Sequence, residues 1–152
     1  DLLTQINKVL CERAKRGMFV TLIYMLLDTA GNNIQIANAG HVSPVYCNDG
    51  ESQLLGHDNK KGLPLGILSD AQYEQETFEL QENSSVTIYT DGVIEAKNTG
   101  GKLFDIKRLL KVIKMQPNDP DLIIKGIINS VDQFTLTEGR SDDLTLLVFT
   151  TN

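Results

Sequence analysis

The spacing of hydrophobic and polar residues predicts a helix and then a meander of strands in the first half of the chain. The apolar positions before Gly17 recur with the period of a helix: Leu2, Leu3, Ile6, Val9 and Leu10. The run at 19–27 is apolar at most positions, which predicts a strand that is covered on both faces. Turn-forming residues at 28–32 lead into a second strand at 34–39, so these two strands are expected to pair as a hairpin.

A second hairpin is predicted at 42–47 and 53–55, because Asp49-Gly50 between them is a strong turn signal. Residues 57–70 are rich in glycine, proline and polar side chains, which predicts a long loop. The remaining pattern predicts two strands, two helices and a last buried strand, at 74–80, 86–90, 103–114, 119–134 and 144–149. Strands joined by hairpins form antiparallel sheets, so the predicted fold class is α+β.

The composition is that of an ordinary globular domain. The 152 residues are 41% hydrophobic and 22% charged, and a chain of this length fits one domain with a real core. No apolar run approaches the roughly 20 residues that cross a bilayer, and no secretory leader pattern is present. We therefore expect a cytoplasmic protein without a membrane partner. The net charge of −6 argues against a nucleic-acid surface, which needs clustered Lys and Arg.

Acidic residues stand at the ends of two predicted strands. Asp91 follows the strand at 86–90, and Asp142-Asp143 precede the strand at 144–149. Carboxylates at the ends of neighbouring strands can converge at one edge of a sheet, and oxygen ligands favour Mg²⁺ or Mn²⁺ over zinc. Neither Cys11 nor Cys47 has a zinc-binding spacing, and both are expected to be buried free thiols. The acids also fit ordinary surface turns, so the pattern alone leaves both interpretations open.

Five short sequence motifs favour the metal site over ordinary surface turns. They are Met18-Phe19-Val20-Thr21-Leu22, Ala37-Asn38-Ala39-Gly40-His41, Gly62-Leu63-Pro64-Leu65-Gly66-Ile67, Tyr89-Thr90-Asp91-Gly92-Val93-Ile94-Glu95-Ala96 and Ser141-Asp142-Asp143-Leu144-Thr145-Leu146-Leu147-Val148. In this order and rough spacing they resemble the SpoIIE/RsbU-type phosphatases, a bacterial branch of the PPM (type 2C) family. The similarity runs from Asp1 to about Phe149, which is essentially the whole chain.

The resemblance implies a four-layer α-β-β-α sandwich of antiparallel sheets with a binuclear Mn²⁺ or Mg²⁺ centre at one edge. It implies that Asp91 and Asp142 are metal ligands. Successive side chains of a strand point to opposite faces, which leaves Asp143 as a supporting or surface acid. The implied reaction is hydrolysis of phosphoserine or phosphothreonine by a metal-activated water, without a protein nucleophile.

His41 falls in the Ala-Gly-His-x-x-Pro stretch of the resemblance. A histidine near a phosphate centre can act as general acid to the departing serine oxygen, whereas the alternative is that it shapes the turn after its strand. His57, in the long loop, is expected to be a surface residue. The segment at 62–67 lacks the spacing of a phosphate-binding loop, so we interpret it as structural or regulatory.

Two departures from the family pattern stand out. The family opens with strands, a helix and a Gly-Asp-x-x-Asp motif whose aspartate bridges the two metals, and no such motif occurs in this sequence. Residues 1–152 are therefore expected to be the C-terminal three quarters of a single phosphatase domain, truncated at its N-terminus and at most weakly active alone. The second departure is Phe104-Asp105, where family members usually have Phe-Gly.

The resemblance implies a phosphorylated signalling protein as substrate, such as a STAS-type antagonist of an anti-sigma factor, and an upstream sensor or receiver domain. Sheet edges without cover would favour a homodimer. One alternative is a non-catalytic signalling or assembly module on the same scaffold, because the metal ligand set is incomplete. A second alternative is an α+β domain that binds a small ligand and carries its acids only on the surface.

Overall fold

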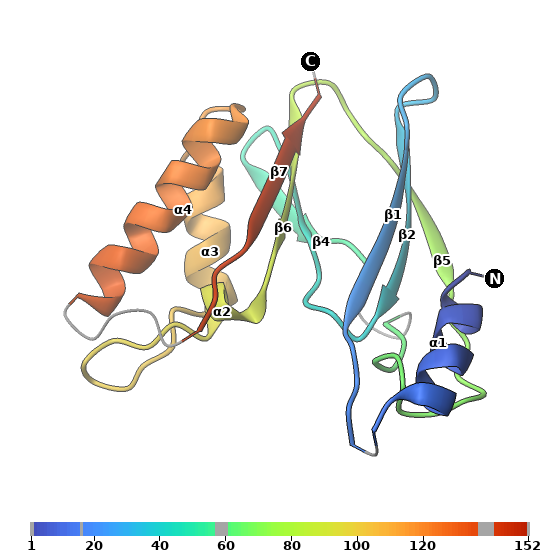
Figure 1. Cartoon of the computed structure of the whole chain (residues 1–152). Coiled ribbons are helices and arrows are strands. Elements are labelled where there is room, and N and C mark those ends of the chain that lie inside the picture. Colours follow the sequence, from blue (N-terminus) through green and yellow to red (C-terminus); the bar gives the residue numbers. More distant parts are fainter. Residues whose placement is uncertain (1, 16, 57–60, 137–141, 152) are drawn as a thin grey trace. The chain divides into compact units, whose positions relative to one another are not determined.

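Two antiparallel sheets organise the chain, each within a unit of its own (Figure 1). The computed structural model describes residues 2–15, 17–56, 61–136 and 142–151. Unit 1 consists of Asp1–Ser43 and Leu55–Leu80, and unit 2 consists of Pro44–Leu54 and Gln81–Asn152. The predicted α+β class with antiparallel sheets is confirmed.

In chain order the elements are α1 Leu2–Arg13, β1 Leu22–Asp28, β2 Asn33–Ala39, β3 Val45–Asn48, β4 Glu51–Leu54, β5 Gln75–Glu79, β6 Ser84–Tyr89, α2 Asp91–Ile94, α3 Asp105–Lys114, α4 Pro120–Thr135 and β7 Leu146–Thr150. Every helix and strand predicted from the sequence has a counterpart here. The short helix α2 was not predicted, because a single turn carries no helical periodicity.

In unit 1, β2 lies between β1 and β5 and pairs antiparallel with both. The turn from β1 to β2 is closed by Asp28, whose Oδ1 accepts hydrogen bonds from the N–H groups of Ala30 and Gly31 at 3.0 Å each. Those bonds, first the one from Gly31, lower the pKa of Asp28. Asn32 completes the turn at φ 47°, a left-handed conformation that asparagine tolerates. The predicted hairpin is confirmed.

The expectation that 19–27 forms one strand covered on both faces is wrong. The strand β1 begins only at Leu22, and Phe19, Leu26 and Leu27 are 59%, 50% and 47% exposed. Among the described residues β1 pairs with β2 alone, so it is an edge strand, and side chains at a sheet edge have fewer neighbours to cover them. A continuous apolar run does not by itself distinguish a central strand from an edge strand.

Helix α1 is tied to the segment at 62–68 by Asn7, whose side chain is fully buried. Its Nδ2 donates to the carbonyl oxygen of Leu68 at 2.8 Å, and its Oδ1 accepts from the N–H of Gly66 at 2.8 Å. The amide thereby satisfies backbone groups of a segment that has few partners in a sheet. The core of unit 1 lies beside it and contains Leu3, Ala37, Ala39, Leu65, Ala71 and Tyr73. Residues 62–68 of the predicted loop are therefore packed against the helix.

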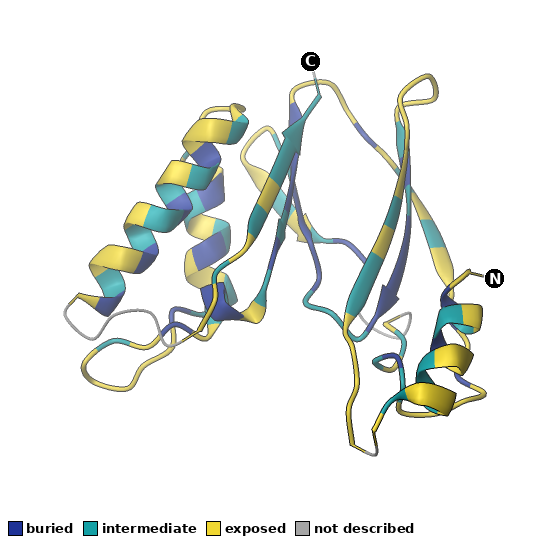
Figure 2. Cartoon of the chain, in the orientation of Figure 1, coloured by how far each residue is buried: buried dark blue, intermediate teal, exposed yellow. Residues whose placement is uncertain are grey.

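In unit 2 the sheet has the order β4-β3-β6-β7, antiparallel throughout. Asp49 and Gly50 join β3 to β4 with φ values of 47° and 75°, the two left-handed residues of a type I′ turn, which confirms the second hairpin. Helices α3 and α4 lie side by side along one face of this sheet (Figure 1). Their buried positions, dark blue in Figure 2, include Ile113, Ile123 and Ile127.

Both long helices of unit 2 begin with an aspartate. Asp119, where the helix was predicted to begin, caps α4: its Oδ1 accepts from the N–H of Leu122 at 2.9 Å, and Pro120 follows it. Asp105 has φ 65°, a conformation that suits glycine. This explains why SpoIIE/RsbU-type phosphatases usually have glycine at this position. In this chain Asp105 contributes a cap instead: Oδ1 accepts from the N–H of Arg108 and Oδ2 pairs with its guanidinium, both at 3.1 Å.

The last strand differs from its prediction. It begins at Leu146 rather than 144 and is not buried throughout, because Leu147 is 54% exposed at the edge of the sheet. Cys11 and Cys47 are free as predicted but only partly buried, so the expectation of buried thiols is wrong. Within the described part of the chain, no helix is both long and apolar enough to span a membrane.

Candidate functional site

The end of β6 and the start of β7 are joined through Thr90. The N–H of Thr90 donates to the carbonyl oxygen of Thr145 at 3.2 Å, and its Oγ1 accepts from the N–H of Thr145 at 3.1 Å. The same hydroxyl donates to the carbonyl oxygen of Asp143 at 3.3 Å. The Thr90 side chain therefore holds the segment before β7 against the end of β6, next to Asp91. Thr90 stands inside one of the five sequence motifs, but this bridging role was not predicted.

Gly92 sets how closely the two segments approach. It is buried, and a Cβ placed on it would lie 2.4 Å from the carbonyl oxygen of Asp143 and 3.7 Å from Cβ of Asp142. A contact of 2.4 Å is closer than a side-chain carbon can come, so only glycine fits here. The segment that carries Asp91 and the segment that carries Asp142 thus lie against each other within unit 2.

Both aspartates present carboxylates to solvent at this end of the sheet. Asp91 Oδ1 accepts from the N–H of Gly92 at 3.1 Å, and Asp142 Oδ1 accepts from the N–H of Asp143 at 2.8 Å. Each carboxylate therefore uses one oxygen to fix its orientation, and its second oxygen accepts no hydrogen bond from the described residues. Asp143 contributes its backbone to this arrangement. Its exposed carboxylate makes no hydrogen bond among the described residues.

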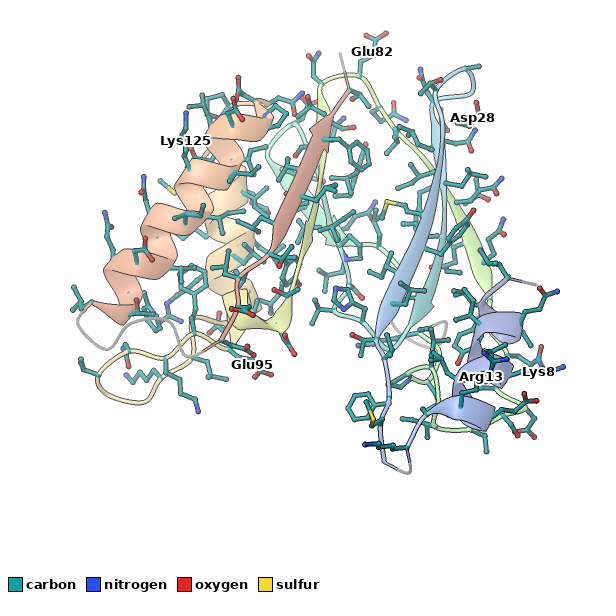
Figure 3. All side chains as sticks on the ribbon, viewed as in Figure 1. Lys8, Arg13, Asp28, Glu82, Glu95 and Lys125 are labelled. Atoms are coloured by element: carbon teal, nitrogen blue, oxygen red, sulfur yellow. The ribbon has the colours of Figure 1, made fainter. Side chains whose placement is uncertain are left out.

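Asp91 and Asp142 supply the type of ligand atom that a hard divalent cation binds. Oxygen atoms of carboxylates are the ligands that Mg²⁺ and Mn²⁺ prefer. In the ranges that the structure describes, no three His, Cys, Asp or Glu side chains gather into a possible metal site. Glu95, labelled in Figure 3, follows α2 and donates its N–H to the carbonyl oxygen of Asp91 at 2.8 Å. The structure brings the segments of Asp91 and Asp142 together, and their role as metal ligands stays a prediction.

Tyr89 is the last residue of β6 and pairs with Leu146 of β7 at this end of the sheet. Burial raises the pKa of its hydroxyl to about 12, so it stays neutral across the physiological range. Tyr89 therefore contributes packing to this end of the sheet and no charge.

His41 belongs to unit 1, where the structure supports the turn-shaping interpretation. Its N–H donates to Asn38 Oδ1 at 2.8 Å, and Asn38 Nδ2 donates to its carbonyl oxygen at 3.0 Å, so a buried amide closes the turn. The ring is half-buried, and its Nδ1 lies 3.1 Å from Oγ1 of Thr21. That contact orients the imidazole. A general-acid role for His41 stays a prediction.

The segment at 62–67 packs against the same turn. Gly62 donates its N–H to the carbonyl oxygen of Asn38 at 2.8 Å, and Leu65 and Val20 exchange both backbone hydrogen bonds. Gly40 has φ 77°, and a Cβ on it would lie 2.5 Å from the ring of Pro64. The motifs around His41 and around Pro64 therefore form one packed assembly, as expected if the segment is structural. His57 and Ser141 lie outside the described residues.

Comparisons with known proteins agree with this geometry. The family model described as Stage II sporulation protein E (SpoIIE) matches residues 1–152. Phosphoserine phosphatase RsbU of Bacillus subtilis is 26% identical over 153 residues, which cover 97% of this chain and 44% of RsbU. Phosphoserine phosphatase RsbP of the same organism is 28% identical over 126 residues, which cover 82% of this chain and 29% of RsbP. The chain thus spans less than half the length of these curated relatives.

A solved structure shows the same fold. The phosphatase domain of the cell fate determinant SpoIIE from Bacillus subtilis, presoaked with Mn, matches with a TM-score of 0.73 at 20% identity. The match covers 99% of this chain and 64% of that domain. The two antiparallel sheets and their helices are therefore those of a PPM-type phosphatase fold.

Proposed function

The chain belongs to the SpoIIE family of serine phosphatase domains, and we propose that it hydrolyses phosphoserine on a signalling protein with the help of Mn²⁺ or Mg²⁺ held by Asp91 and Asp142. The observation that supports this most strongly is the contact between Gly92 and the backbone of Asp143. It brings two solvent-facing carboxylates of unit 2 to one end of the sheet, at two motifs of the family.

In this proposal each residue of the site has a limited task. Asp91 and Asp142 would hold the cation with the oxygens that their own neighbours leave available. Thr90 and Gly92 keep the two segments at a fixed separation, so that the carboxylates are preorganised. When bound, a divalent ion supplies Lewis acidity to a phosphoryl oxygen and lowers the pKa of water. The exposed position of both aspartates gives a bulky phosphoprotein access.

We further propose that residues 1–152 form the larger part of one phosphatase domain whose sheets stack as a four-layer sandwich. The 64% coverage of the solved SpoIIE domain supports this. A third carboxylate, as in the Gly-Asp-x-x-Asp motif, would then complete a binuclear centre from outside the described residues. This agrees with the absence, among the described residues, of three acidic, histidine or cysteine side chains that gather into a metal site.

The partners that the resemblance to SpoIIE/RsbU-type phosphatases implies are part of this proposal. A phosphorylated STAS-type antagonist would be the substrate, and a sensor or receiver domain would control the phosphatase. Self-association as a homodimer is supported by exposed apolar side chains of unit 1: Met18, Phe19, Val20, Leu63, Ile67 and Leu68. Light scattering on the purified chain tests it, and a monodisperse monomer would refute it.

The test of the proposed activity is release of inorganic phosphate from a phosphoserine peptide with and without Mn²⁺. We expect turnover that requires the metal, stops with a chelator and is weak for the 152 residues alone. A phosphotyrosine peptide of the same sequence serves as control and should be a poorer substrate. Metal-independent turnover would contradict the proposal.

A non-catalytic role on the same scaffold is the second candidate. It is favoured by the absence, within the described ranges, of a third acidic or histidine ligand beside the two aspartates. This alternative would be selected if longer forms of the protein are folded but release no phosphate, even with saturating Mn²⁺.

A further inference from the structure

The positive charge of unit 2 is concentrated in one segment, which starts in the connection from α2 to α3 and ends with α3. Residues 97–114 contain six of the 14 lysines and arginines of the chain but only one of its 20 aspartates and glutamates. The segment therefore carries a formal charge of +5, in a chain whose net charge is −6. It starts three residues after α2, the single helical turn that begins at Asp91. The charge of this segment is thus opposite to that of the neighbouring aspartate.

The connection from α2 to α3 is a loop that its own hydrogen bonds hold in one shape (Figure 1). Lys97 and Leu103 form an antiparallel bridge. Between them Asn98 donates its N–H to the carbonyl oxygen of Lys102 at 3.0 Å, and its Oδ1 accepts from the N–H of Lys102 at 2.9 Å. Phe104, which is 2% exposed, anchors the end of the loop in the core of unit 2. Lys97 and Lys102 therefore stand on a preorganised loop, which lowers the loss of conformational freedom when a partner binds.

We call four exposed lysines of this segment the lysine ledge: Lys97, Lys102, Lys107 and Lys111. Lys102 precedes the bridge partner of Lys97, so the Cα atoms of these two lysines are about 6 Å apart. Lys107 and Lys111 are one turn apart on α3, and Cβ atoms in that relation are about 5–6 Å apart. None of the four forms an ion pair among the described residues. The ledge thus presents two close pairs of cations whose charge is available to a partner.

The ledge begins close to Asp91, whose other neighbours are acidic. The chain advances about 1.5 Å per residue in a helix and at most about 3.6 Å beyond it, so the Cα atoms of Asp91 and Lys97 are at most about 15 Å apart. Around Asp91 the exposed side chains of Glu95, Asp142 and Asp143 carry negative charge. Acidic residues of a partner are therefore repelled at the aspartates and attracted at the ledge.

We propose that the lysine ledge docks acidic residues of the phosphoprotein substrate that stand three to five positions from its phosphoserine. This inference rests on the proposed phosphatase function, with the phosphoserine at Asp91 and Asp142. An extended peptide advances about 3.3 Å per residue, so the docked acids lie roughly 10–17 Å from the phosphoserine, which matches the span from Asp91 to Lys97. A nucleic acid fits less well, because the acids around Asp91 repel the phosphates that continue beyond the ledge.

The first test measures binding and does not depend on turnover. The ¹⁵N-labelled chain is titrated with a phosphoserine peptide that carries glutamate at positions three to five on both sides, without divalent ions and at constant ionic strength. We expect saturable amide shifts at residues 97–103 and 107–111, and at least roughly fivefold weaker binding when the glutamates are glutamines. Equal binding of the two peptides, or shifts that leave these residues unchanged, would overturn the proposal. A single-stranded DNA of equal charge that binds the same residues more tightly would overturn it in favour of a nucleic acid.

Paired variants locate the docking surface. Lys97→Gln combined with Lys102→Gln should weaken binding of the glutamate peptide by roughly fivefold and leave the glutamine peptide unaffected. Lys114→Gln combined with Lys125→Gln removes the same charge from the last residue of α3 and from α4, where Figure 3 shows Lys125 away from Glu95, and should bind as the unaltered chain does. All four lysines are exposed, so each variant should keep its fold, which its amide spectrum reports. Unchanged affinity in the folded Lys97 and Lys102 variant would overturn the proposal.

Kinetics separate this inference from the proposed activity. In a form of the protein that releases phosphate, the Lys97 and Lys102 variant should raise KM for the glutamate peptide roughly fivefold and leave kcat unchanged. Turnover of p-nitrophenyl phosphate, which has no acidic residues to dock, should not change. A fall in kcat for both substrates would contradict a docking role. Absence of turnover in every form of the protein would refute the phosphatase proposal, and the peptide titration would then decide on the ledge alone.

Discussion

Replacing Asp91 or Asp142 by alanine is expected to lower Mn²⁺-dependent hydrolysis of a phosphoserine peptide by roughly 100-fold or more. Each change removes a carboxylate whose orientation the neighbouring N–H fixes, and a cation held by few ligands cannot lose one without a large loss of occupancy. The assay uses whichever form of the protein, these 152 residues or a longer chain, turns the substrate over.

Asp143→Ala is the matched control for these two variants. It removes a carboxylate next to Asp142, while the backbone oxygen that contacts Thr90 and Gly92 stays in place. We expect less than a fivefold change in turnover, since its carboxylate is exposed and makes no hydrogen bond or ion pair among the described residues. Because Asp91 and Asp142 are exposed, their alanine variants should keep the stability of the unaltered chain. Near-normal turnover in either variant would refute their assignment as ligands.

Gly92→Ala is expected to damage both stability and activity. The new Cβ would lie 2.4 Å from the backbone oxygen of Asp143, and a backbone atom cannot move aside as the end of a flexible side chain can. Separating the two segments should cost about 1–3 kcal/mol of unfolding free energy in unit 2. It should also move Asp142 relative to Asp91 and so weaken Mn²⁺ binding. Denaturant unfolding and a Mn²⁺ titration measure the two effects.

Gly100→Ala provides the comparison for that substitution. Its added Cβ would come no closer than 3.4 Å to a neighbouring atom, the side-chain Oδ1 of Asn98. We expect a change in unfolding free energy of less than about 0.5 kcal/mol and no change in Mn²⁺ binding. A Gly92→Ala protein as stable as Gly100→Ala, with unaltered metal binding, would show that the close approach at Asp143 is not required.

Much of the fold could be predicted because its signals are local. The Asp49-Gly50 turn and the Asp119-Pro120 helix start each depend on a few adjacent residues, and both are found as predicted. Burial was harder, since it depends on neighbours distant in sequence. The apolar residues of β1 do not indicate that this strand lies at a sheet edge. Leu147 of β7 was predicted to be buried for the same reason, and it is exposed.

The site was predictable only in part. The positions of Asp91 and Asp142 at strand ends are visible in the sequence, and the glycine after Asp91 hints at a close approach. The partner in that approach, the backbone of Asp143, is visible only in three dimensions. The same holds for Thr90, which bridges 53 residues, and for Asn7, which bridges 59 residues to Gly66. Long-range hydrogen bonds of single polar side chains leave no periodic pattern.

We claim that a divalent cation binds at the Asp91 and Asp142 end of unit 2. Paramagnetic Mn²⁺, added in small steps to the ¹⁵N-labelled chain, broadens the amide signals nearest to its binding site. We predict that residues 90–93 and 142–145 broaden first, with weak affinity, and that Asp142→Ala removes the effect. The acidic turn at Asp28, whose carboxylate already accepts two backbone hydrogen bonds, should remain sharp. Broadening that begins at Asp28 or Asp49, or that persists unchanged in Asp142→Ala, would contradict the claim.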